Sequence, residues 1–132
     1  MKVFVIPGDP IAWKRAAPLY QKRIMYDYQS KLKEITRSYI DQQQSNQDMF
    51  FDVPLHLDIT FYMPVPDSLS EKKKEKLYGT YHKVKPDSSN LQKYYEDCCS
   101  KIVYYDDCLI ASTSTKKIYD KEPRVEFSLK VL

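Results

Sequence analysis

The segment from residue 85 to residue 107 carries the side chains of this sequence that are best suited to chemistry. A carboxylate precedes a predicted helix, an amide, a lysine and a further carboxylate lie on it, and an acidic pair follows it. These residues are Asp87, Asn90, Lys93, Asp97, Asp106 and Asp107. Two carboxylates about 4 Å apart repel by roughly 4 kcal/mol at an effective dielectric constant of about 20, so such a cluster needs a proton, a lysine or a divalent cation. Oxygen-rich sites favour Mg²⁺ or Mn²⁺, and the segment therefore has the layout of a metal-dependent phosphodiesterase site.

The helix that would position these groups is predicted to begin near Ser89 or Asn90. Pro86 disfavours a helical conformation at Lys85, so the chain arrives extended. Ser89 and Gln92 then fit a capping-box pattern, in which both side chains satisfy backbone amides of the first turn. At 100° per residue the helix has an apolar and a polar face. The apolar face is formed by Leu91, Tyr95, Cys98 and Ile102, and the polar face by Asn90, Lys93 and Asp97.

The same residues also fit ordinary structural roles. An aspartate after a proline is common as a turn or capping residue, and Lys93 with Asp97 forms an i,i+4 helix pair. Adjacent aspartates such as Asp106 and Asp107 are frequent in turns between strands. The spacing alone therefore leaves both interpretations open.

A resemblance to a known family favours the catalytic interpretation. The run Lys-Pro-Asp-x-x-Asn-Leu-x-Lys, followed by Asp97 and an Asp-Asp pair, resembles the signature of the RusA-type Holliday junction resolvases, small endodeoxyribonucleases often carried by prophages. The similarity continues in residues 6–10 and 63–68 and in the basic pairs Lys14-Arg15 and Lys116-Lys117. It implies a Mg²⁺-dependent endonuclease that resolves four-way junctions by paired symmetric nicks in DNA recombination and repair. It also implies a homodimer, because a two-fold dimer would present two active sites to a junction of near two-fold symmetry.

Under this interpretation each residue of the segment has a role. Asp87 and Asp107 would be the main metal ligands, with Asp106 as an alternative to Asp107 because the loop length leaves the register open by one residue. Asp97 would be a third carboxylate or would support a ligand. Lys93 would neutralise charge on the scissile phosphate or its leaving oxygen. The amide on the helix would orient the first carboxylate or bind phosphate.

One position departs from the family pattern. Ser89 stands where the family typically carries a second acidic residue after the Lys-Pro-Asp run. Either the site works with the remaining carboxylates and Ser89 binds through a water, or its metal affinity is weakened. The second case predicts a protein that binds branched DNA and cleaves it poorly or not at all.

Basic residues are the candidates for contacts with the DNA backbone. The formal net charge is only +3, from 21 basic and 18 acidic residues, so local clustering carries more information than the overall charge. A solvated surface is the alternative for the lysines between residues 72 and 76, and for Lys14 and Arg15. The predicted DNA contacts are Lys14, Arg15, Lys72, Lys73, Lys74, Lys85, Asn90 and Lys116.

The pattern of apolar residues predicts an α+β fold in a single domain spanning residues 1–132. Strict alternation from Val53 to Met63 predicts a strand with one buried face. A helix over residues 28–42, capped by Asp27, is predicted to cover the sheet with a stripe formed by Leu32, Ile35 and Tyr39. A short lysine-rich helix is predicted over residues 69–78. Strands over residues 109–118 and 125–131 predict an antiparallel C-terminal hairpin in a mixed β-sheet with packed helices.

Composition also limits where the protein works. No segment approaches the roughly 20 apolar residues that cross a bilayer, so no membrane association is expected. The cysteines Cys98, Cys99 and Cys108 are odd in number and lack a paired zinc spacing, which predicts reduced thiols. We therefore expect a cytoplasmic protein.

Overall fold

The computed structural model describes residues 2–15, 17–19, 24–26, 29–44 and 50–132 of the chain. The predicted cap Asp27 and the first residue of the helix predicted over 28–42 lie outside these ranges. In chain order the elements are β1 (Phe4–Pro7), β2 (Ala17–Leu19), β3 (Ile24–Tyr26), α1 (Ser30–Gln43), β4 (Leu55–Met63), α2 (Glu71–Leu77), α3 (Ser88–Cys99), the 3-10 turn η1 (Asp107–Leu109), β5 (Ile110–Tyr119) and β6 (Arg124–Val131).

A four-stranded mixed sheet in the order β1-β6-β4-β5 is the frame of the molecule. β4 pairs in parallel with β5 and antiparallel with β6, which confirms the predicted α+β class with a mixed sheet. The two C-terminal strands run in opposite directions and are joined by the short turn at residues 120–123, as predicted, with β4 lying between them in the sheet. The inward residues of β4 are all buried, namely Leu55, Leu57, Ile59, Phe61 and Met63.

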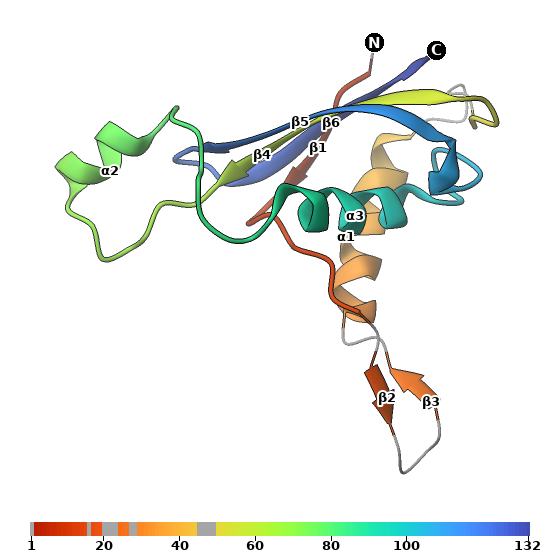
Figure 1. Ribbon diagram of the computed structural model, residues 1–132, viewed down its shortest axis with the longest axis horizontal. Coiled ribbons are helices and arrows are strands. Elements are labelled where there is room, and N and C mark those ends of the chain that lie inside the picture. Colours follow the sequence, from red (N-terminus) through yellow and green to blue (C-terminus); the bar gives the residue numbers. More distant parts are fainter. Residues whose placement is uncertain (1, 16, 20–23, 27–28, 45–49) are drawn as a thin grey trace.

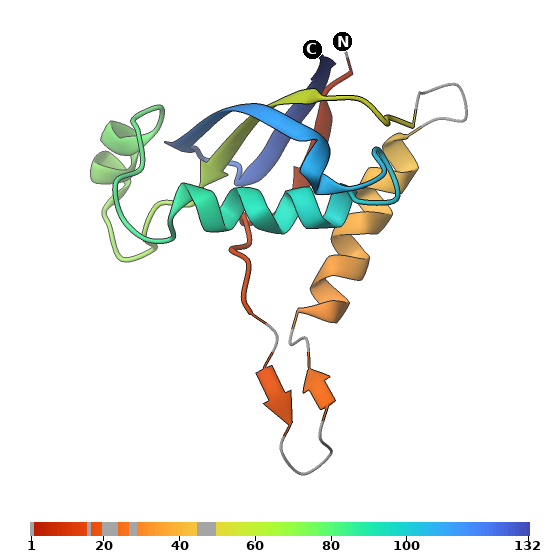
Figure 2. The ribbon, with the colours of Figure 1, turned by 45° about the vertical axis from the view of Figure 1, so that its right-hand side comes forward.

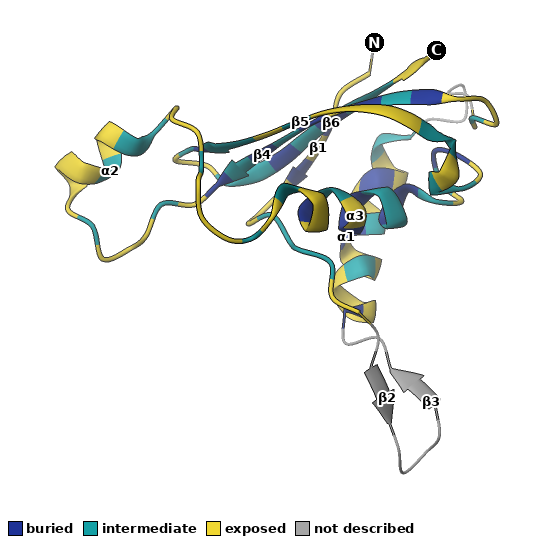
Figure 3. Ribbon diagram, viewed as in Figure 1, coloured by how far each residue is buried: buried dark blue, intermediate teal, exposed yellow. Residues whose placement is uncertain are grey.

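Helices α1 and α3 lie on the same face of this sheet, and α2 stands apart beyond the end of β4 (Figures 1 and 2). Burial is concentrated in β4 and in the sides of α1 and α3 that approach the sheet (Figure 3). None of the helices in the described ranges is long and apolar enough to cross a membrane. The core therefore lies between the sheet and two helices, and α3 is the helix that carries the predicted site.

Helix α3 confirms the predicted apolar face and starts slightly earlier than predicted. Asp87 is its N-cap residue, and its buried side chains are Leu91, Tyr94, Tyr95, Cys98 and Cys99. Asn90 and Lys93 are exposed, as the polar face requires. Ile102 lies beyond the end of the helix, where it is only partly buried.

The predicted orientation of α1 is wrong. Leu32, Ile35 and Tyr39 are 45%, 57% and 37% exposed and do not cover the sheet. The helix instead buries Thr36 and Ile40, and the Thr36 hydroxyl lies 3.0 Å from the Tyr94 hydroxyl on α3. A polar hydrogen bond to a neighbouring helix thus overrides the apolar stripe, which periodicity alone cannot reveal.

Helix α2 is shorter than predicted. It begins at Glu71, because Ser70 is the N-cap and its side chain accepts a hydrogen bond from the Lys73 amide at 3.3 Å. The helix therefore begins two residues later than predicted, with Ser70 as its cap.

Candidate active site

Helix α3 and strand β5 face each other along a row of polar side chains. Residues 113, 115 and 117 of β5 are paired with buried β4 residues, so their side chains lie on the face of the sheet that the helices cover. The Thr115 hydroxyl donates to Gln92 Oε1 at 2.5 Å, and Gln92 Nε2 donates to Glu96 Oε1 at 2.8 Å. We call this row the α3–β5 seam; it consists of Gln92, Glu96, Thr115 and Lys117, with Asp87 and Asp107 at its ends.

The C-terminal end of the seam brings Asp107 and Glu96 together. Burial raises the pKa of Glu96, and the negative charge of Asp107 raises it further, while the hydrogen bond from Gln92 and the charge of Lys93 oppose the shift. Glu96 and Asp107 are both partly buried. A carboxylate that is partly buried near a second negative charge is stabilised by a proton or by a cation, so Glu96 is a group whose charge a divalent cation would stabilise.

Asp106, unlike Asp107, has a structural role as the cap of η1. Its carboxylate accepts a hydrogen bond from the Cys108 amide at 3.4 Å and thereby caps η1. Hydrogen bonds from Cys108 hold the pKa of Asp106 below its usual range. Of the two adjacent aspartates, Asp107 is therefore the one placed near the seam.

The N-terminal end of the seam carries Asp87 in an exposed position. Lys85 Nζ lies 2.9 Å from Asp87 Oδ1, and both side chains are largely exposed. Lys117 Nζ donates to the carbonyl oxygens of Val84 at 2.8 Å and Pro86 at 2.7 Å. The surface ion pair contributes little, because solvent screens it, so the backbone contacts are the firmer constraint here.

The structure does not gather the predicted carboxylates into one cluster. Asp87 and Glu96 are nine residues apart, which separates their backbones by about 13 Å along α3. Within the described residues, no group of three or more histidine, cysteine, aspartate or glutamate side chains is arranged to hold a metal ion. The predicted site is thus divided between the two ends of the helix.

The polar face of α3 is divided as well. Asp97 forms an ion pair with Lys33 of α1 at 3.1 Å, on the side of α3 that faces α1. Lys93 Nζ lies 3.8 Å from the centre of the Trp13 ring, and the Trp13 amide donates to the Asn90 carbonyl at 2.9 Å. Lys93 therefore remains available at the surface, whereas Asp97 is occupied by a helix-to-helix contact.

Comparison with known proteins decides the family. The family described as endodeoxyribonuclease RusA matches residues 7–130. The chain belongs to the RusA endodeoxyribonuclease family. It is 26% identical over 133 residues to the uncharacterized protein YqaN of Bacillus subtilis (strain 168), a match that covers 96% of this chain and 94% of that protein. It is 32% identical over 79 residues to the crossover junction endodeoxyribonuclease rusA of Lactococcus phage r1t, covering 59% of this chain and 55% of the phage protein.

The basic residues predicted to contact DNA lie on several surfaces of this RusA family member. Lys14 and Arg15 are exposed next to Trp13, in a loop held by buried Gln29, whose side chain accepts from the Lys14 amide and donates to the Ala12 carbonyl. Exposed lysines also include Lys72 and Lys73 on α2, Lys85 before α3 and Lys116 on β5.

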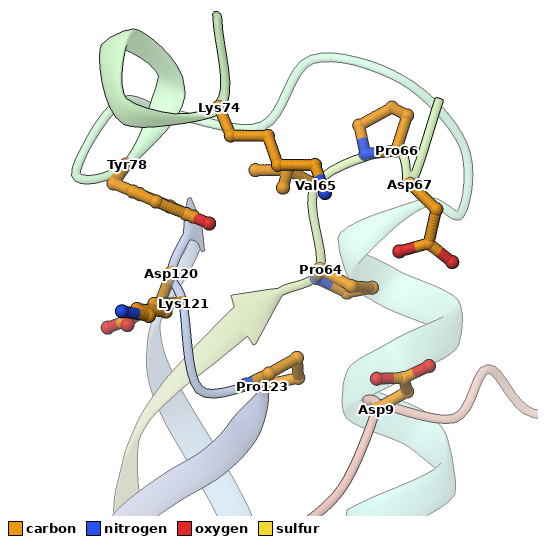
Figure 4. Close-up of a pocket in the computed structure, with 10 residues that line it drawn as sticks. All are labelled: Asp9, Pro64, Val65, Pro66, Asp67, Lys74, Tyr78, Asp120, Lys121 and Pro123. Atoms are coloured by element: carbon orange, nitrogen blue, oxygen red, sulfur yellow. The ribbon is translucent and has the colours of Figure 1, made fainter. Parts of the chain in front are cut away.

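Lys74 differs from the other lysines of α2. It lies 3.6 Å from Glu71 and lines a cleft of about 600 Å³ between α2, the β5–β6 turn and the loop after β1 (Figure 4). Three aspartates, Asp9, Asp67 and Asp120, also line this cleft. Lys121 also lines the cleft and Asp120 is paired with Arg124, so Lys74 stays a predicted DNA contact, less exposed than Lys72 and Lys73.

The sequence did not predict a site role for Gln92, Glu96, Thr115 or Lys117. Gln92, predicted to take part in a capping box, instead bonds Thr115 and Glu96. A signal for them existed in β5, where Thr113, Thr115 and Lys117 occupy one phase of the strand alternation. Polar residues on the phase that faces a helix indicate a polar interface and not a core. On α3, Gln92 and Glu96 are four residues apart and therefore share a face.

Proposed function

We propose that this chain is a Mg²⁺-dependent endodeoxyribonuclease that resolves four-way DNA junctions by paired nicks, as a homodimer. The observation that carries the proposal is the α3–β5 seam, in which Asp107 lies beside half-buried Glu96 and the family's Lys-Pro-Asp run delivers Asp87 to the other end. Family membership and the similarity to the phage crossover junction endodeoxyribonuclease support DNA cleavage at crossover junctions. A two-fold dimer would present one site to each of two strands.

The donor set fits a cation that also binds the substrate. Mg²⁺ is usually held by one or two carboxylates, with water and substrate phosphates completing its shell. Asp107 with Glu96 provides such a pair, and Mn²⁺ can take the same oxygen ligands. When bound, the ion would stabilise charge on the phosphate and activate water. We propose Asp87 as a third carboxylate that cleavage requires, acting from the opposite end of the seam.

Positive side chains near the seam have complementary roles in the proposal. Lys93, exposed and stacked on Trp13, would neutralise charge that develops on the scissile phosphate. Lys14, Arg15 and the exposed lysines of α2 would bind the backbone of the junction arms, without reading sequence. Such contacts recognise shape, which is the property that distinguishes a branch from a linear duplex.

Cleavage of a labelled four-way junction tests this function. The purified chain is incubated with Mg²⁺, with Mn²⁺ or with chelator, beside a linear duplex of the same sequence. The proposal expects paired nicks that depend on the metal and are confined to the junction. Equal cutting of the linear duplex, or junction cutting that persists in chelator, would overturn it.

Ser89 favours a second candidate function, a branched-DNA-binding protein with weakened catalysis. Ser89 is exposed in the first turn of α3, where the family pattern carries an acid. Restoring the carboxylate with Ser89→Asp separates the two functions. A gain in cleavage rate of about tenfold or more would favour the weakened site. An unchanged rate in an active protein would show that the seam works with serine at this position.

A further inference from the structure

The segment before Asp87 runs along the edge of β5 and is held there by backbone hydrogen bonds. The Gly79 amide donates to the Tyr119 carbonyl at 2.8 Å, and the Tyr119 amide donates to the Thr80 carbonyl at 2.9 Å. The His82 amide donates to the Lys117 carbonyl at 2.9 Å, and the His82 ring packs 4.8 Å from the Tyr119 ring. Residues 79–82 therefore form a short extension of the sheet.

Between His82 and Asp87, the side chain of Lys117 and not the backbone of β5 makes the hydrogen bonds to this segment. Its ammonium group donates to the carbonyl oxygens of Val84 and Pro86, at 2.8 and 2.7 Å. Both distances are those of charge-assisted hydrogen bonds, which are shorter and stronger than bonds between neutral groups. Lys117 thus ties the residues that precede Asp87 by one and three positions to a strand of the central sheet.

Other contacts of the part of this segment next to Asp87 are weak. Tyr81 and Val84 are 70% and 56% exposed, so the segment gains little from apolar burial. Asp87 is the N-cap residue, but its side chain makes no capping hydrogen bond, and its ion pair with Lys85 is exposed to solvent. The direction in which Asp87 enters the seam is therefore governed by the backbone at residues 84–86.

We infer that Lys117 is a positioning residue that sets Asp87 at the N-terminal end of the seam by fixing the backbone of residues 84–86 to β5. This inference rests on the proposed function, because it gives Asp87 a position that matters for cleavage. The ammonium group contacts the protein backbone, so its contribution is to the placement of a carboxylate and not to the binding of junction arms.

Three variants of the full chain test this role. Lys117→Met keeps the length of the side chain and removes the donor, and Lys117→Arg keeps a charged donor. Lys130→Met is the matched control, because Lys130 is an exposed lysine on β6 of the same sheet. Each variant is measured for single-turnover cleavage at saturating protein, for junction Kd as a function of salt, and for amide hydrogen exchange.

The positioning role predicts a distinct combination of results. Lys117→Met lowers the cleavage rate by about 10²-fold, the size expected when a reacting group is misplaced by an ångström. Its junction Kd and the salt dependence of that Kd stay at the wild-type values. The backbone amides of residues 82–88 lose protection from exchange, while β4 and the core of α3 keep theirs. Lys117→Arg recovers part of the rate, and Lys130→Met matches the wild type throughout.

Two outcomes would overturn the inference. A weaker Kd with a salt slope reduced by about 0.9 in Lys117→Met would show that Lys117 neutralises a phosphate. Wild-type protection of residues 82–88 in the same variant would show that the hydrogen bonds of Lys117 do not hold this segment. The exchange measurement does not depend on activity. If the wild-type chain fails to cut junctions, the proposed function is refuted, but hydrogen exchange still shows whether Lys117 holds residues 84–86.

Discussion

At the N-terminal end of α3, Asp87 is exposed and its position follows from hydrogen bonds to the backbone before it. At the C-terminal end, Glu96 is half-buried beside Asp107, and the burial raises its pKa. Hydrogen bonds thus fix the backbone at the first end, whereas burial makes the charged form of Glu96 unfavourable at the second. Changes at the first end should alter activity with little effect on stability. Changes at the second should move activity and stability in opposite directions.

The difference follows from the path of the chain around the seam. β5 runs alongside α3, so Lys117 reaches the start of the helix while Thr115 reaches its middle through Gln92. The loop after α3 returns Asp107 against the third turn, where Glu96 already lies close to the core. A residue near a core loses solvation, and charge there is costly until a partner arrives.

The largest effect is expected from Asp107→Asn. Removal of this carboxylate should lower junction cleavage on the order of 10³-fold, because it removes a proposed ligand of the ion that would stabilise charge on the reacting phosphate. Junction binding should be kept or become tighter, since the variant repels phosphate less. Single-turnover cleavage and junction Kd are measured beside Asp58→Asn, an exposed aspartate of β4. Loss of folding in Asp107→Asn, seen as a lost thermal transition, would make the residue structural.

Glu96→Gln should have opposite effects on activity and stability. The pKa of Glu96 is raised in the folded chain, so the folded state binds a proton more readily than the unfolded state. Stability is therefore fullest below the ordinary pKa of glutamate and falls as the pH rises through the folded value. The variant should melt above the wild type at about pH 7 and equally at about pH 4, in chelator.

The matched control for Glu96→Gln is Glu34→Gln, an exposed glutamate on α1. It should show no gain that depends on pH. Cleavage by Glu96→Gln should fall by at least roughly 10- to 100-fold, the usual cost of removing a residue that only supports a metal ligand, because Glu96 is itself a proposed ligand. A melting temperature that does not change with the substitution at neutral pH would contradict the electrostatic strain at this end of α3.

Trp13→Leu should have the smallest effect, because it acts on a side chain between the two ends. The Trp13 ring attracts the Lys93 ammonium at 3.8 Å, and an exposed cation–π contact is worth about 0.5–1 kcal/mol. Loss of that contact should lower the cleavage rate by roughly two- to fivefold. Trp13→Phe should retain most of the rate, as a single-turnover comparison of both variants would show. Equal losses in the two variants would mean that bulk, and not the ring, is needed.

Elements with an unbroken pattern could be predicted from the sequence. β4 alternates from Leu55 to Met63, and the apolar residues Leu91, Tyr95 and Cys98 of α3 recur at helical spacing, so both elements were predicted correctly. Their ends were not, because Val53 is exposed before β4 and Ile102 lies beyond α3. The predicted buried face of α1 was wrong, because its apolar stripe is exposed whereas Thr36 is buried and hydrogen-bonded to Tyr94. Periodicity identifies a face, but only the tertiary structure decides which face is covered.

The division of the site could not be predicted for a related reason. Helical spacing placed Asn90, Lys93 and Asp97 on one face of α3. Different neighbouring elements contact that face, and Asp97 forms an ion pair with Lys33 of α1. Glu96, one position away, faces the seam instead. The return of the chain after α3 determines that Asp107 lies near enough to Glu96 for its charge to act there, and loop paths of this kind leave no periodic signal in a sequence.

Single-turnover cleavage of a four-way junction in Mg²⁺ by Asp87→Asn tests the central claim, that both ends of α3 serve one reaction. If both ends serve one reaction, Asp87→Asn loses cleavage to an extent comparable to Asp107→Asn, with unchanged junction binding and an unchanged melting temperature. Cleavage at the wild-type rate would contradict it, and would confine the active site to Asp107 and Glu96 at the C-terminal end of the helix.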